Sequence, residues 1–368
     1  MKVGIIGAGQ LGRMLALAGY QLGIQSTFLD PDATSSGGQV GPVIVGALDD
    51  PASLRELAEQ VDVVTFDIEN VSVELLADAT AAIWPPPRAL AVAQDRLSEK
   101  QMFEAIGIPT TSYVPVADVA DLARCGSALG WPIVLKARTL GYDGRGQRIV
   151  RTPDDLEPAW RSLGGVPAIA EGWVDFECEL SLIAARGSDG STAFYPLAEN
   201  VHSDGILYST TAPYIDPPLQ TLAEGYLGAI LDRFGYRGVL TVEFFLAGGQ
   251  LIANELAPRV HNSGHWTIEG AETSQFENHL RAILGLPLGS TTPTGHAYMI
   301  NLLGSVPGRE RLLSVKGLHL HDYGKAPRPQ RKVGHGTIVA ADRSALLERA
   351  AALRAAVTAA LETPAGLY

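Results

Sequence analysis

Short apolar runs alternate with amphipathic stretches at the start of the chain, which predicts alternating strands and helices. The predicted strands are 2–6, 25–29, 61–67 and 82–84, and the predicted helices are 13–22, 51–60 and 72–79. This alternation is typical of a parallel sheet covered by helices, a Rossmann-like α/β arrangement. Three consecutive prolines at 85–87 stop the pattern, so we place the first domain boundary near residue 97.

The remainder of the chain mixes strand and helix patterns without this regular alternation. The predicted helices are 95–106, 118–129, 217–235, 275–284 and 343–361. The predicted strands are 112–115, 133–137, 168–174 and 177–184, one ending near residue 201, and several short ones after residue 296.

Two β-rich runs within residues 238–257 flank Gly248-Gly249, which predicts a β-hairpin. Each run carries one carboxylate where an apolar residue is expected, Glu243 and Glu255. A two-residue turn alone would place Glu243 opposite Asn254, whereas a longer loop or one bulge would pair the two acids. Paired like charges repel, and a magnesium ion completed by nucleotide phosphates would turn that repulsion into a binding site. The alternative is that both acids are solvated or paired with Arg259.

Composition places the chain among packed globular proteins. Its 368 residues suit two or three domains, with 46% hydrophobic and 18% charged residues. A net charge of −12 argues against non-specific nucleic-acid binding. Cys125 and Cys178 are too few for a disulfide framework. The first residues predict a strand and not a signal peptide, and no apolar run reaches membrane-spanning length, so we expect a cytoplasmic protein.

Residues 7–12 form a GxGxxG motif between a strand and a helix, and Asp30 ends the next strand. This is the pattern of a dinucleotide-binding loop, which makes an NAD-dependent oxidoreductase one hypothesis. The other hypothesis is that the glycines are structural or hold a different phosphate. Asp30 directly precedes Pro31 and a Ser/Gly-rich loop, which is an awkward setting for a ribose contact.

A second glycine-rich loop, residues 141–147, follows a predicted strand that contains Lys136. Backbone amides of such a loop can surround a triphosphate while the lysine neutralises it. The alternative is a flexible hairpin tip. The loop is not a P-loop, because the lysine precedes the glycines.

Several other polar residues stand where a binding site is expected. Glu179 is either a ribose hydroxyl acceptor or a structural strand acid, and a lone His202 is more often structural. Polar side chains crowd residues 259–265, which suggests recognition of an anionic or hydroxylated ligand. Four cations within residues 325–332 of an acidic chain suggest a phosphate site.

The combined motifs resemble the ATP-grasp superfamily, and within it the 5-(carboxyamino)imidazole ribonucleotide synthases of purine biosynthesis. The motifs are GAGQLGRML (7–15), DIENV (67–71), GYDGRGQ (141–147), NELAPRVHNSGHWT (254–267) and YGK with RKVGH (323–335). The resemblance implies an α/β and α+β multidomain fold: a Rossmann-like N-terminal domain, an ATP-grasp fold of two α+β lobes and a small C-terminal β-rich segment. The implied domains are residues 1–97, 98–175 with the glycine lid, and 176–368 with the metal hairpin.

The resemblance also implies roles for individual residues. Nucleotide binding falls to Arg96, Lys136, Gly141, Tyr142, Asp143, Gly144, Arg145, Gly146, Gln147, Glu171, Gly172, Trp173, Val174, Glu179, His202, Asn254 and Glu255. Substrate binding falls to Gln10, Glu69, Arg259, His261, Asn262, Ser263, Lys325, Arg331 and Lys332. Catalysis falls to Lys136, Tyr142, Asp143 and Arg259, with Asp143 the candidate base. Glu243 and Glu255 are the implied magnesium ligands. Ala257 stands where many ATP-grasp enzymes have an asparagine that supplies a second metal ligand, and Ile68 replaces a phenylalanine.

The implied reaction uses ATP, magnesium and bicarbonate to carboxylate 5-aminoimidazole ribonucleotide. Bicarbonate is first phosphorylated to carboxyphosphate, and the amine then attacks carboxyphosphate or free CO2. The expected assembly is a homodimer, with no nucleic-acid or membrane partner. The alternatives are another ATP-grasp carboxylase or ligase with a different acceptor, the oxidoreductase, and a non-catalytic nucleotide-binding regulator.

Overall fold

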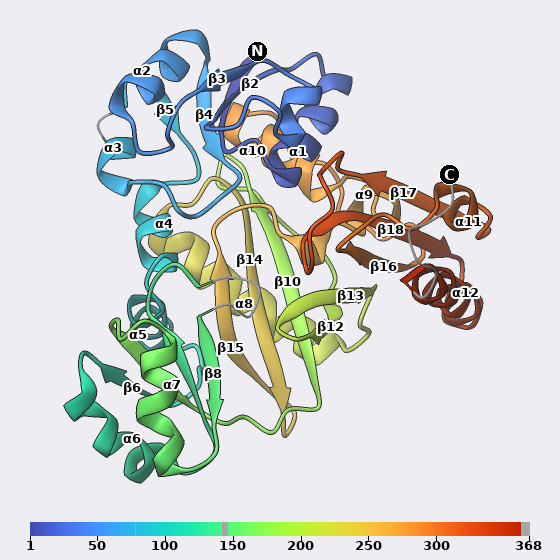
Figure 1. Cartoon of the computed structure of the whole chain (residues 1–368). Coiled ribbons are helices and arrows are strands. Elements are labelled where there is room, and N and C mark those ends of the chain that lie inside the picture. Colours follow the sequence, from blue (N-terminus) through green and yellow to red (C-terminus); the bar gives the residue numbers. More distant parts are fainter. Residues whose placement is uncertain (78, 142–145, 362–368) are drawn as a thin grey trace.

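Figure 1 shows the computed structural model of the chain, which describes residues 1–77, 79–141 and 146–361. The N-terminal part is a parallel sheet in the order β3-β2-β1-β4-β5. Its strands are β1 (Lys2–Ile6), β2 (Gln25–Asp30), β3 (Val43–Val45), β4 (Val63–Phe66) and β5 (Ala82–Ile83). Its helices are α1 (Gln10–Gln21), α2 (Pro51–Gln60), α3 (Val73–Ala77) and α4 (Pro87–Ala93). The predicted Rossmann-like arrangement is confirmed.

Strand β3 and helix α4 of this part were not predicted. The edge strand β3 has only three residues, too few for a sequence pattern. The triple proline does not end regular structure, because α4 begins at Pro87. Proline suits the first helical position, where its fixed φ fits the helix and its missing N–H leaves no backbone hydrogen bond unmade.

The second sheet is antiparallel, in the order β6-β9-β7-β8. Its strands are β6 (Tyr113–Val116), β7 (Ile133–Ala137), β8 (Gln147–Val150) and β9 (Ala168–Gly172). Its helices are α5 (Arg96–Ala105), α6 (Leu122–Leu129) and α7 (Leu156–Ser162). The helix predicted over 118–129 begins as a 3-10 turn, η2 (Val119–Asp121), and β8 and α7 were not predicted.

The third sheet is antiparallel and runs β15-β14-β10-β12-β13-β16-β18-β17, with β11 paired to β10. Its strands are β10 (Cys178–Arg186), β11 (Thr192–Phe194), β12 (Ala198–Ser203), β13 (Ile206–Ala212), β14 (Gly238–Ala247), β15 (Gln250–Ala257), β16 (His296–Leu303), β17 (Leu318–Asp322) and β18 (Lys332–Ala340). Its helices are α8 (Pro217–Phe234), α9 (Thr267–Gly270), α10 (Gln275–Leu284), α11 (Arg309–Leu313) and α12 (Arg343–Leu361). Short 3-10 turns occur at η1 (Ser36–Gln39), η3 (Pro153–Asp155) and η4 (Asn262–Gly264).

Both faces of the centre of this sheet are buried, because successive side chains of a strand point to opposite faces. Leu182 of β10 packs in the apolar cluster that contains α8. Ile183, the next residue, packs in the cluster that contains α10 and α1. The centre of the sheet, with the long strands β10, β14 and β15, therefore lies between the layer that contains α8 and the layer that contains α10 and α1 (Figure 1).

The N-terminal domain docks on the third sheet through α1, which lies beside α10 (Figure 1). A Cβ at Gly19 of α1 would come within 3.0 Å of Leu280, so the glycine permits this close approach. Thr65 Oγ1 lies 2.8 Å from His279 Nε2 in the buried interface. This docking places the glycine loop after β1 next to the segment between β17 and β18.

The three sheets occupy residues 2–83, 113–172 and 178–340. The predicted domain limits near residues 97 and 175 lie between the sheets and stay a prediction. Within residues 1–77, 79–141 and 146–361, no helix has the length and apolarity needed to cross a bilayer.

Candidate active site

Two adjoining cavities lie between the second and third sheets and the N-terminal domain. The first has a volume of about 260 Å³ and the second about 570 Å³. Residues that line both are Arg96, Glu255, His261, Asn262 and Lys332. A molecule in one cavity would therefore meet a molecule in the other at these five side chains.

The hairpin of β14 and β15 places Glu243 directly opposite Glu255. The turn pairs Ala247 with Gln250, so the loop is the two glycines alone. A bulge between Glu243 and Phe244 then shifts the register by one residue and brings the two acids together. The prediction that one irregularity pairs them is confirmed, and Arg259 instead forms an ion pair with Glu69 at 2.5 Å.

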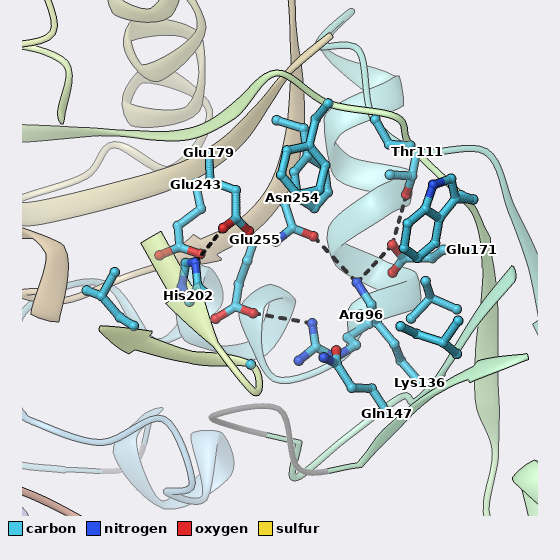
Figure 2. A pocket seen from close by; sticks show the side chains of 18 of the residues that line it. Arg96, Thr111, Lys136, Gln147, Glu171, Glu179, His202, Glu243, Asn254 and Glu255 are labelled. Atoms are coloured by element: carbon cyan, nitrogen blue, oxygen red, sulfur yellow. Dashed lines mark hydrogen bonds and ion pairs between the residues drawn. The ribbon is translucent and has the colours of Figure 1, made fainter. Parts of the chain in front are cut away.

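The two carboxylates have different electrostatic environments. Burial raises the pKa of Glu243 to about 7, and the charges of Glu255 and Glu179 add to the rise. Burial also disfavours ionisation of Glu255, but Arg96, whose guanidinium lies 3.3 Å away, together with Lys136 and Arg259 outweighs it and holds the pKa of Glu255 below its usual range. Figure 2 shows both carboxylates in the same cavity, beside His202.

His202 and Glu179 form a pair on β12 and β10. His202 Nδ1 lies 2.7 Å from Glu179 Oε2. Burial disfavours the charged imidazole, but this hydrogen bond and the nearby Glu243 raise the pKa of His202. His202 is thus part of the cavity wall and not a solitary core histidine.

Lys136 of β7 points into the first cavity and contacts one residue of β9 and one residue of β15. Its Nζ lies 2.9 Å from Glu171 Oε2 and 3.4 Å from Asn254 Oδ1 (Figure 2). Lys100 of α5 also approaches Glu171, at 3.8 Å, and Thr111 Oγ1 donates a hydrogen bond to the same carboxylate at 3.0 Å. Burial opposes ionisation of Glu171, but the two lysines overcome it and lower its pKa to about 2.

Apolar and aromatic side chains form part of the lining of the first cavity. Phe176 and Phe245 stack with ring centroids 4.7 Å apart. Further apolar side chains that line this cavity are Val134, Ile149, Trp173, Val174 and Leu207. A slot of this kind suits a planar heterocycle, and the charged groups of Lys136 and Glu255 line the same cavity.

The second cavity has a cationic wall. Lys325 Nζ contacts Gln10 Oε1, which joins the C-terminal segment to the N-terminal domain. Arg328, Arg331 and Lys332 line the same cavity. Such a cluster suits a phosphate group.

The glycine loop of the N-terminal domain holds side chains of the protein itself. Asp67 Oδ2 accepts hydrogen bonds from the amides of Gly9 at 2.8 Å and Gly12 at 3.0 Å. Asp30 Oδ2 accepts from the amide of Ala8 at 2.8 Å. Internal carboxylates thus occupy the anion position of this loop, and the dinucleotide interpretation of residues 7–30 is wrong.

Comparison with known proteins agrees with this geometry. Three family models match the chain: the ribonucleotide synthetase preATP-grasp domain over residues 1–94, the ATP-grasp domain over 101–276, and the phosphoribosylaminoimidazole carboxylase C-terminal domain over 297–349. The N5-carboxyaminoimidazole ribonucleotide synthase of Pseudomonas aeruginosa is 51% identical over 361 residues, which cover 98% of this chain and 100% of the relative. The chain belongs to the N5-carboxyaminoimidazole ribonucleotide synthase family.

Solved structures of this synthase family have the same fold. The synthetase from Thermus thermophilus is 50% identical with a TM-score of 0.92, and the match covers 97% of this chain and 98% of that one. The synthase from Aspergillus clavatus, in complex with ADP and 5-aminoimidazole ribonucleotide, is 33% identical with a TM-score of 0.91 over 97% and 98% of the two chains. The predicted fold, a Rossmann-like domain followed by an ATP-grasp fold and a C-terminal segment, is confirmed.

The cavities gather most residues that the synthase resemblance suggested. The predicted residues that line the first cavity are Arg96, Lys136, Gln147, Glu171, Gly172, Trp173, Val174, Glu179, His202, Glu243, Asn254, Glu255, His261, Asn262 and Lys332. Those that line the second are Gln10, Glu69, Arg96, Gly141, Glu255, Arg259, His261, Asn262, Lys325, Arg331 and Lys332. Tyr142, Asp143, Gly144 and Arg145 lie outside the described residues.

Two predicted residues line neither of the two cavities. Ser263 is fully buried and its hydroxyl lies 2.9 Å from His261 Nδ1, so it supports His261 instead of facing a ligand. The carbonyl of Gly146 accepts a hydrogen bond from the amide of Ala137. Its φ of +77° is one that glycine adopts most readily.

The sequence interpretation missed several site residues. Glu99 and Lys100 are buried, and Glu99 Oε1 accepts from the amide of Leu256 at 2.6 Å. Burial raises the pKa of Glu99 to about 8. Arg96, Glu99 and Lys100 stand at i, i+3 and i+4, so the signal was a charged stripe on one face of α5. No comparable spacing marks Thr111 or Asp67.

Proposed function

We propose that this enzyme carboxylates the amine of 5-aminoimidazole ribonucleotide, with ATP and bicarbonate as co-substrates. The products are 5-carboxyaminoimidazole ribonucleotide, ADP and phosphate, in purine biosynthesis. The observation that carries the proposal is the meeting of the two cavities at Arg96, Glu255, His261, Asn262 and Lys332. A reaction that transfers an activated group from a nucleotide site to an acceptor site needs such a junction.

ATP fits the first cavity with its base in the apolar slot. Its phosphates would then lie towards Lys136 and Arg96, with Glu179 near the ribose. Lys136 already faces the cavity from a rigid strand, so its charge can stabilise the transferred phosphoryl group without reorganisation. The rest of the rate enhancement comes from holding the reactants in the correct geometry, because phosphoryl transfer needs no covalent bond to the protein.

The residues present fit a magnesium ion. Glu243 and Glu255 supply two oxygen-bearing carboxylates opposite each other, and burial of this like-charged pair raises the pKa of Glu243 to about 7. A hard cation would relieve that repulsion and is bound by such ligands together with phosphate oxygens. When bound, the ion would neutralise charge on the ATP phosphates.

Both chemical steps take place where the two cavities meet. A bicarbonate oxygen attacks the γ-phosphorus of ATP, ADP leaves, and carboxyphosphate forms. The amine of the ribonucleotide then takes the carboxyl group, either from carboxyphosphate or from CO2 released by it. Phosphate leaves with the former bicarbonate oxygen and can accept the proton that the amine loses. Arg259 lines the second cavity and is held there by Glu69, where its charge suits the anionic intermediate.

The ribonucleotide fits the second cavity with its phosphate at the cationic wall of Lys325, Arg331 and Lys332. The predicted roles of Tyr142 and of Asp143 as base rest on the sequence alone. The homodimer rests on the family resemblance, and the cytoplasmic location is an expectation from the sequence.

The test is release of ADP by purified protein with ATP, magnesium, bicarbonate and a panel of amine acceptors. We expect ADP release that depends on bicarbonate and on 5-aminoimidazole ribonucleotide. Equal turnover with other amines, or turnover without bicarbonate, would overturn the assignment of the acceptor or of the activated group.

A further inference from the structure

Asp67 closes the glycine loop of the N-terminal domain from inside. It directly follows β4 and is 8% exposed. One carboxylate oxygen accepts from both Gly9 and Gly12. Burial raises the pKa of Asp67 to about 6, and the two amides oppose the rise, so the group is ionised at neutral pH.

The glycines of the motif make room for this carboxylate. A Cβ at Gly7 would overlap Asp67 Oδ1. A Cβ at Gly9 or Gly12 would lie 3.0 Å from Asp67 Oδ2, closer than an ordinary van der Waals contact. In other proteins the GxGxxG loop leaves room for a pyrophosphate. In this chain the same space is filled by the Asp67 side chain, whose hydrogen bonds fix the loop conformation.

The held loop carries Gln10, which stands between the two bonded amides. Gln10 Oε1 accepts a hydrogen bond from Lys325 Nζ across the junction of the N-terminal domain and the C-terminal segment. The partner segment is held as well, because Ser36 Oγ donates to the carbonyl of Tyr323. Both sides of the Gln10–Lys325 contact are therefore fixed by buried hydrogen bonds.

We propose that Asp67 is a positioning residue: its carboxylate fills the anion position of the glycine loop and thereby sets Gln10 against Lys325 at the ribonucleotide end of the second cavity. This inference rests on the proposed function. It assigns to the motif the task of shaping an acceptor site, in place of nucleotide binding.

The test compares Asp67→Ala, Gln10→Ala and the double variant by the KM for 5-aminoimidazole ribonucleotide and the KM for ATP. A lost positioned hydrogen bond corresponds to about a tenfold rise in the ribonucleotide KM, and we expect this rise in each single variant with the ATP KM unchanged. Because Asp67 acts through Gln10, the double variant should match Gln10→Ala alone. Multiplying effects, or equal rises in both KM values, would overturn the proposal.

Two further variants separate positioning from plain loss of stability. Asp67→Asn keeps an oxygen that can accept from both amides, so it should restore a near-normal ribonucleotide KM. Asp50→Ala removes the cap of α2, where Asp50 accepts from the amides of Ala52 and Ser53, and should lower Tm without changing either KM. A rise in the ribonucleotide KM in Asp50→Ala would overturn the proposal.

Failure of the inference and failure of the proposed function give different results. Wild-type protein without ribonucleotide-dependent turnover would remove the proposed function. Wild-type turnover with an unchanged ribonucleotide KM in Asp67→Ala would remove only the positioning role. If Asp67→Ala does not fold, Asp67→Ser takes its place. Its shorter side chain cannot reach both amides, so we expect the same rise in the ribonucleotide KM, and an unchanged KM would again remove the positioning role.

Discussion

Glu243 and Glu255 face each other across β14 and β15 because a single bulge next to Glu243 shifts the strand register by one residue. Without the bulge, the two-residue turn would place Asn254 opposite Glu243 and turn Glu255 to the other face of the sheet. The same irregularity thus creates a like-charged pair and the cation site that we propose for it.

Removal of either acid should abolish ATP turnover. Glu243→Gln and Glu255→Gln each keep the shape of the side chain but remove a charged oxygen ligand. We expect turnover to fall on the order of 100-fold or more, because the phosphoryl transfer loses its proposed metal. The exposed Glu59→Gln on α2 is the matched control and should keep full ADP release. Normal turnover in Glu255→Gln would contradict the assignment.

The affinity for magnesium and a non-hydrolysable ATP analogue should depend on pH through Glu243. Burial raises the pKa of Glu243 to about 7, so its protonated form, which cannot bind the ion, accumulates as pH falls. We expect the affinity to drop about tenfold per pH unit below that pKa. Calorimetric titrations of wild type and Glu243→Gln separate this effect from titration of the nucleotide, which both proteins share. Parallel pH profiles for the two proteins would contradict the prediction.

Glu171 should stabilise the fold only while it is ionised. Its pKa is lowered from 4.5 to about 2, so the stabilisation is fully present above about pH 4.5 and is lost as pH falls towards 2. The shift corresponds to about 3 kcal/mol at neutral pH. Urea unfolding should show Glu171→Gln destabilised at neutral pH, with the difference from wild type smaller by about 1 kcal/mol near pH 3.5. A difference that is constant with pH would show that the ion pairs with Lys136 and Lys100 do not account for the shift.

Lys325 should matter for the ribonucleotide and not for ATP. Lys325→Met removes a cation from the wall that we assign to the ribonucleotide phosphate, while the first cavity is unchanged. We expect the ribonucleotide KM to rise about tenfold to 100-fold and the ATP KM to stay constant. The exposed Lys316→Met is the control for loss of one positive charge. A selective rise in the ATP KM would place the phosphate elsewhere.

Much of the site could be predicted because its charged residues interrupt the apolar pattern of predicted strands. A lysine inside β7 and a glutamate in each arm of an apolar hairpin are exceptions to the expected apolar positions, and all three face the first cavity. The residues that support them could not be found in this way. Lys100 is buried next to Glu171 by the packing of α5, and the charged stripe that it forms with Arg96 and Glu99 does not reveal from the sequence that this face of the helix is buried.

The GxGxxG motif shows where sequence reasoning is limited. The motif specifies a loop with backbone amides close to an anion, and it does not specify which anion. The answer depends on Asp67, which lies far along the chain and is brought to the loop by the pairing of β4 with β1. The short strand β3 and the helix α4 were missed for different reasons: β3 is too short for periodicity, and proline at the start of α4 hid the helix.

The most direct test of the central claim follows the oxygen atoms of bicarbonate. The purified protein is incubated with ATP, magnesium, 5-aminoimidazole ribonucleotide and bicarbonate labelled with oxygen-18, and the released phosphate is analysed by mass spectrometry. Transfer through carboxyphosphate predicts that each phosphate carries a single labelled oxygen. Unlabelled phosphate, formed at the same rate as ADP, would show that ATP is hydrolysed by water and would contradict the account.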